Sequence, residues 1–101
     1  MELEVRERLL LLMLMPEHGN IGDIRIINQL KSDLSFTEEE HKDWNLKRDE
    51  DGNYTWDKNN TGTYFDIGER AKDIIKVELT KLSDSGRATE RHLKLYDKFE
   101  M

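Results

Sequence analysis

Apolar residues near the start of the chain predict a first helix over Glu2 to Met15. The segment is rich in good helix formers, has acidic residues in its first turn, and is stopped by Pro16. Residues Leu9 to Met15 are apolar on every side. That pattern is typical of a helix at the centre of a core or of one shared with a partner.

A second helix is predicted over about residues 21–33, with Asn20 as its N-cap. Its apolar positions follow helical spacing and are Ile24, Ile27, Leu30 and Leu34. A short third helix should run from Glu38 to about Asn45, because Thr37 and Glu40 have the spacing of a capping box.

The pattern changes to that of a β-hairpin between Asn45 and Asp57. Asp51-Gly52 is a strong turn signal, and the Tyr, Thr and Trp residues after it favour a strand. Lys58 to Thr63 is polar and predicts a loop, and Tyr64 to Ile67 predicts either a short strand or an entry into the next helix.

Two helices are predicted in the C-terminal part. The first spans Asp66 to Ser83 and ends before Gly86, which suits a left-handed terminator. The second begins after Thr89 as N-cap. Its apolar stripe is expected to consist of Leu93, Tyr96 and Phe99.

This order of elements resembles a winged helix-turn-helix module over roughly the first 57 residues. Thr37 to Asn45 takes the place of the recognition helix, and Asn45 to Asp57 that of the wing. The expected fold is mainly helical (α+β), with one small hairpin and about five helices, of which the last two follow the winged-helix-like part, in one domain over residues 1–101. The chain also resembles small phage or prophage proteins at Leu9–Pro16 and Leu95–Phe99.

Charge is concentrated in the region that would face DNA. Residues 35–57 hold eight acidic and three basic residues, which gives −5 of the chain's net charge of −6. A base-reading helix needs Arg, Lys, Asn or Gln, and phosphate contacts need basic groups. The sequence therefore argues against nucleic acid as the partner, and points to protein binding or DNA mimicry.

Composition excludes several kinds of chemistry. The chain has no cysteine, so disulfides, thiolate metal sites and cysteine nucleophiles are absent. The acidic turn at residues 49–53 is not a calcium loop of the EF-hand kind, since placing Gly52 at the sixth position puts Lys47 and Lys58 at ligand positions. The histidines are scattered, and no nucleophile elbow or phosphate loop occurs. We therefore expect no enzymatic activity, metal or cofactor.

We expect a non-enzymatic interaction module. Its partner-binding residues would be Glu38, Glu39, Asp43, Trp44, Tyr54 and Trp56, on the third helix and the hairpin. Core closure around the hairpin is the other interpretation of these aromatic residues. The partner would be a protein, for which a basic surface would suit the acidic residues, and a second copy of the chain would form a homo-dimer. Contacts between copies would use Leu11, Met15, Tyr96 and Phe99.

The alternative expectation is a winged-helix DNA-binding transcription regulator. The longest apolar run is seven residues, where a bilayer span needs about 20, and no signal peptide is recognisable, so we expect no membrane association and a cytoplasmic protein.

Overall fold

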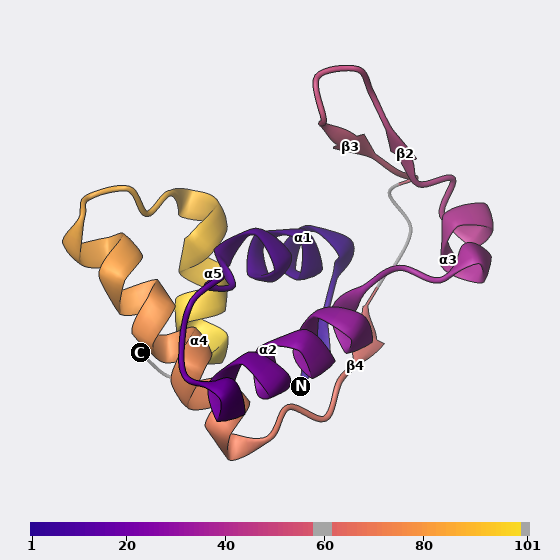
Figure 1. Cartoon of the computed structure of the whole chain (residues 1–101). Coiled ribbons are helices and arrows are strands. Elements are labelled where there is room, and N and C mark those ends of the chain that lie inside the picture. The colour runs from indigo at the N-terminus through magenta and orange to yellow at the C-terminus, as the bar shows by residue number, and fades with distance from the viewer. Residues whose placement is uncertain (58–61, 100–101) are drawn as a thin grey trace.

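The computed structural model describes residues 1–57 and 62–99, which form two regions (Figure 1). Residues 1–35 and 62–99 make a helical unit that we call the body. Residues 36–57 project from it and are called the arm. Most of the loop predicted over Lys58 to Thr63 lies outside the described residues.

The body contains four helices and one pair of short strands among the described residues. Its helices are α1 (Val5–Leu14), α2 (Ile21–Leu34), α4 (Glu69–Asp84) and α5 (Glu90–Lys98). Strand β1 (Glu2–Leu3) pairs antiparallel with β4 (Thr63–Tyr64). The arm contains α3 (Glu38–Asp43) and a hairpin of β2 (Lys47–Arg48) with β3 (Tyr54–Thr55).

The prediction of a mainly helical α+β chain is confirmed, with two small antiparallel sheets rather than one. The expected five helices are reached only if the six-residue α3 is counted beside the longer four. The β1–β4 sheet, which was not predicted, makes the first helix begin at Val5 rather than at Glu2. Residues 2–3 belong to β1, and Glu4 caps α1 by donating its backbone N–H to Glu7 Oε1 at 3.0 Å.

One continuous hydrophobic core lies inside the body. Its buried members come from β1, from all four body helices and from the segments beside them: Leu3, Leu11, Met15, Ile27, Leu30, Leu34, Ile67, Ala71, Ile75, Leu79, Leu95 and Phe99. The stripe expected on the last helix was wrong in one member. Leu93 is 59% exposed, whereas Leu95 is fully buried, because Leu95 and Phe99 are one turn apart and face the core together.

The residues expected to join two copies lie in this same core. Leu11, Met15 and Phe99 are buried, and Tyr96 is half-buried with its hydroxyl donating to the Leu79 carbonyl. A side chain packed inside its own chain has no surface left for a second copy. Leu11, Met15 and Phe99 therefore serve the core of the monomer, which corrects their expected assignment, whereas Tyr96 keeps part of its surface exposed.

Other local predictions are confirmed. Asn20 accepts a hydrogen bond from the Asp23 N–H at 2.8 Å, and Gly86 ends α4 with a φ of 73°. Within residues 1–57 and 62–99, no helix has both the length and the hydropathy that crossing a bilayer requires.

Candidate functional site

The arm is built from strong local signals. Thr37 and Glu40 form the expected capping box at the start of α3, with Thr37 N–H to Glu40 Oε1 at 2.9 Å and Glu40 N–H to Thr37 Oγ1 at 3.1 Å. Asn45, with φ of 51°, ends the helix in the left-handed conformation that asparagine tolerates. The Leu46 N–H then donates back to the His41 carbonyl at 3.1 Å.

The hairpin turns over Asp49 to Asn53. The Asp49 N–H donates to the Asn53 carbonyl at 2.9 Å, and Gly52 occupies the turn with φ of 86°. The Asp49 carboxylate accepts from the Asn53 N–H at 2.9 Å. The turn is thus closed by its own residues, and the acidic tip is left at the end of the arm (Figure 1).

The predicted acidic residues lie together on the surface of the arm. Glu38, Glu39 and Asp43 are exposed, and α3 buries none of its side chains. Of the arm's eight acidic residues, Glu40 alone forms an ion pair with a residue that the structure describes. Because the arm has only three basic residues beside its eight acidic ones, it keeps a net negative field around it.

The predicted aromatic residues also lie in the arm, but none of them is freely exposed. Trp44, Tyr54 and Trp56 are half-buried. Arg48 lies over the Tyr54 ring, with its Cζ 5.8 Å from the ring centroid. The aromatic side chains therefore serve partly to close the arm's own structure, and the acidic groups form most of its outer surface.

Arg8 is the residue that sequence reasoning missed. It lies on α1 and is 1% exposed. Its Nε donates to the Leu34 carbonyl at 3.0 Å and its Nη2 to the Ser35 carbonyl at 2.8 Å, at the C-terminal end of α2. Two further bonds, of 2.7 and 3.1 Å, reach both carboxylate oxygens of Glu40 on α3. One guanidinium thus joins α1, the end of α2 and the arm.

Aromatic rings surround this guanidinium. The centroids of the Phe36, Phe65 and Trp44 rings lie 4.1, 5.0 and 6.0 Å from Arg8 Cζ. Partial burial by itself would raise the pKa of the Glu40 carboxyl. Hydrogen bonds from Arg8 and the Thr37 backbone, with the attraction of the Arg8 charge, outweigh burial and hold that pKa below its ordinary value of 4.5. The Glu40 carboxylate therefore stays ionised at neutral pH beside the buried Arg8 guanidinium.

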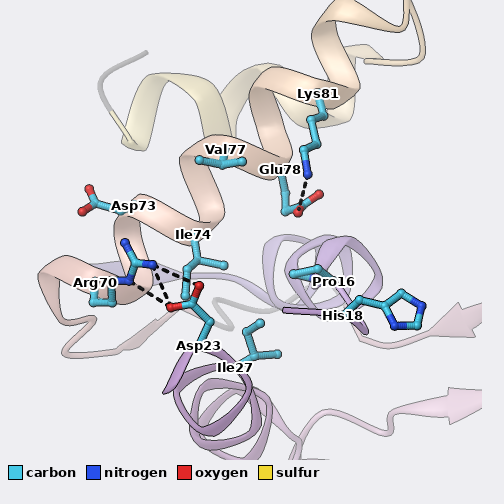
Figure 2. Close-up of a pocket in the computed structure, with 10 residues that line it drawn as sticks. All are labelled: Pro16, His18, Asp23, Ile27, Arg70, Asp73, Ile74, Val77, Glu78 and Lys81. Carbon is cyan, nitrogen blue, oxygen red and sulfur yellow. Dashed lines mark hydrogen bonds and ion pairs between the residues drawn. The ribbon is translucent and has the colours of Figure 1, made fainter. Parts of the chain in front are cut away.

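The body carries a shallow groove between α2 and α4, with a volume of about 220 Å³ (Figure 2). Arg70 and Asp23 point toward one another there and form a bidentate pair at 2.8–3.0 Å. Lys81 pairs with Glu78 at 3.4 Å. The groove is smaller than typical small-molecule sites of about 300–1,000 Å³, and these charges already satisfy each other. The arm is accordingly the better candidate site.

The site was also compared with metal-binding arrangements and with known proteins. In the part of the chain that the structure describes, no group of three His, Asp or Glu side chains is arranged to hold a metal ion. Comparison with models of protein families, with curated proteins and with solved structures finds no match.

Proposed function

We propose that this protein is a non-enzymatic interaction module whose acidic arm binds a basic protein surface. The proposal rests on one observation: the negative charge is concentrated in the arm, whereas the hydrophobic core lies entirely in the body. The arm holds a net charge of −5, projects from the body and contributes no residue to the continuous hydrophobic core. Exposed carboxylates that are not needed for folding are free to steer and orient a basic partner.

The test is a charge reversal with a matched control. Glu38, Glu39 and Asp43 are changed together to lysine, and the control variant carries lysine at three exposed acids of α4, namely Glu69, Asp73 and Asp84. Proteins captured by the wild-type chain are identified, and the affinity of each purified partner is then measured by calorimetry at two salt concentrations. The arm variant should lose capture, whereas the control should retain it.

Retained affinity in the arm variant, with circular dichroism showing an intact fold, would sink the proposal.

The same proteins also test the DNA-binding alternative. A winged-helix regulator should retard duplex DNA at about 50 mM salt, where phosphate contacts are strongest. The acidic surface of α3 supports the opposite expectation, namely no retardation.

Self-association remains part of the proposal, but with other residues. Met13 and Leu93 are 83% and 59% exposed, which makes them the most exposed large apolar side chains of α1 and α5 and the best placed to contact a second copy. Sizing of the pure protein should show a dimer that Met13→Ser and Leu93→Ser weaken. A monomer at millimolar concentration contradicts this part alone.

A further inference from the structure

Polar contacts of Arg8, rather than the hydrophobic core, join the arm to the body. No residue of the arm belongs to that core or to the half-buried apolar side chains packed against it. Leu46 is the arm's one buried apolar residue among those described, and it lies outside the core cluster. Hydrophobic contacts are non-directional, so they would fix the arm's direction weakly even where they occur.

The guanidinium of Arg8 is directional. Leu34 and Ser35 both contribute backbone carbonyls of the body, and these two acceptors fix the plane of the guanidinium. A carboxylate that binds the same fork must then approach in that plane, as Glu40 does with both oxygens. The Phe36 and Phe65 rings lie over the group at 4.1 and 5.0 Å and restrict it further.

We propose that Arg8 is a lock that fixes the direction of the arm relative to the body, and that the arm becomes a movable unit when the Arg8–Glu40 pair is broken. The proposal concerns the position of the arm and does not depend on what the arm binds. Any partner that spans arm and body would meet a preorganised surface in the wild-type chain, and a variable one after the lock opens.

The experiment uses the absence of cysteine in the chain. Cysteines introduced at Asp51, on the hairpin turn, and at Thr80, on the exposed side of α4, carry spin labels whose distance distribution is measured by pulsed electron resonance. Glu40→Gln removes the carboxylate charge with little change in volume, and Arg8→Lys keeps the positive charge but loses the planar fork. The control is Asp23→Asn, which breaks an exposed bidentate pair inside the body.

We expect a single narrow distribution for the wild-type pair and for Asp23→Asn, and a clearly broader one for both lock variants. Circular dichroism of the same proteins at about 25 °C should keep the helix content of wild type, because opening of the arm leaves the body folded. Unchanged distributions in both lock variants would show that other contacts hold the arm. Loss of helix content in step with the broadening would show that Arg8 acts on the whole fold. Equal broadening in the control would show that the effect is not specific to the Arg8–Glu40 pair; either result overturns the proposal.

Discussion

The body and the arm are stabilised in different ways. The body joins four helices around one apolar core and has a net charge of −1, since 5 of the 6 excess negative charges fall in residues 36–57. The arm has six residues of helix and a small hairpin, and Leu46 is its one buried apolar side chain among those described. The body is held by hydrophobic burial, whereas the arm depends on caps, a tight turn and a partly buried ion pair.

This difference shows why charge can collect in one region of a small protein. Like charges repel, and packing them over a shared core would oppose folding. A projecting arm keeps its carboxylates in water, where repulsion is screened. Arg8 compensates the one acidic residue of the arm, Glu40, that lies at the join.

The largest expected effect is the difference in unfolding free energy between truncating a buried leucine of the body and truncating one of the arm. Leu79→Ala should cost about 2–5 kcal/mol of unfolding free energy, because Leu79 is fully buried in the body. Leu46→Ala, the matched change in the arm, should leave the main transition of the body nearly unchanged. Urea unfolding followed by far-ultraviolet circular dichroism checks both. Equal losses would mean that arm and body unfold as one unit.

The second effect is at the join. Glu40→Gln should cost about 1–3 kcal/mol, because it leaves the buried Arg8 guanidinium without its counter-charge while the two backbone acceptors remain. Thermal and urea unfolding measure it. A Glu40→Gln variant as stable as wild type would show that the charge of Glu40 adds nothing to the free energy of unfolding.

Acid should remove the same contribution. The pKa of Glu40 is lowered in the folded chain, so its ionised form stabilises the fold fully above the ordinary value of 4.5, and the contribution is lost as pH falls through the lower folded value. Stability of the wild type should therefore fall below about pH 4.5 more steeply than that of Glu40→Gln. Unfolding free energies measured from pH 6 to pH 3 check the difference, and parallel curves would contradict it.

A smaller effect compares two glycines. Gly52 in the arm and Gly86 after α4 have φ of 86° and 73°, so alanine at either position should cost about 1 kcal/mol of strain. The Gly86→Ala loss should appear in global unfolding. The Gly52→Ala loss should appear in the hairpin amides by hydrogen exchange, and a global loss from Gly52→Ala would contradict the independence of the arm.

The smallest effect concerns the surface of the body. Asp23→Asn should cost only about 0.2–1 kcal/mol, because Arg70 is 57% exposed and water screens the pair. High salt should reduce even this difference between the two proteins in urea unfolding. A loss above about 2 kcal/mol would assign the Arg70–Asp23 pair a structural role comparable to that of Arg8.

Local signals made much of the fold predictable. Asn20, the Thr37–Glu40 box, Asp51-Gly52 and Gly86 each act through the backbone within a few residues, so their positions follow from the sequence alone. The acidic residues of the candidate site were also placed correctly on one short element, α3. Charge density on a capped helix needs no tertiary contact to be recognised.

Long-range contacts were not predictable in the same way. Strand β1 forms because residues 2–3 meet residues 63–64, far along the chain. The apolar faces of α1 and α5 both allowed a partner interpretation, since periodicity shows which residues are apolar but not what covers them. Their packing into a single body explains why Leu11, Met15 and Phe99 are core residues.

The sequence by itself determined the helices, the hairpin turn and the place where negative charge collects, because capping, turn conformation and charge are properties of neighbouring residues. Only the tertiary structure decided the role of Arg8. It is one of two arginines within three positions, Arg6 and Arg8, and Arg6 is exposed while Arg8 is buried. A guanidinium can leave water only where enough acceptors converge on it, and here they come from α2 and α3, which the fold brings together.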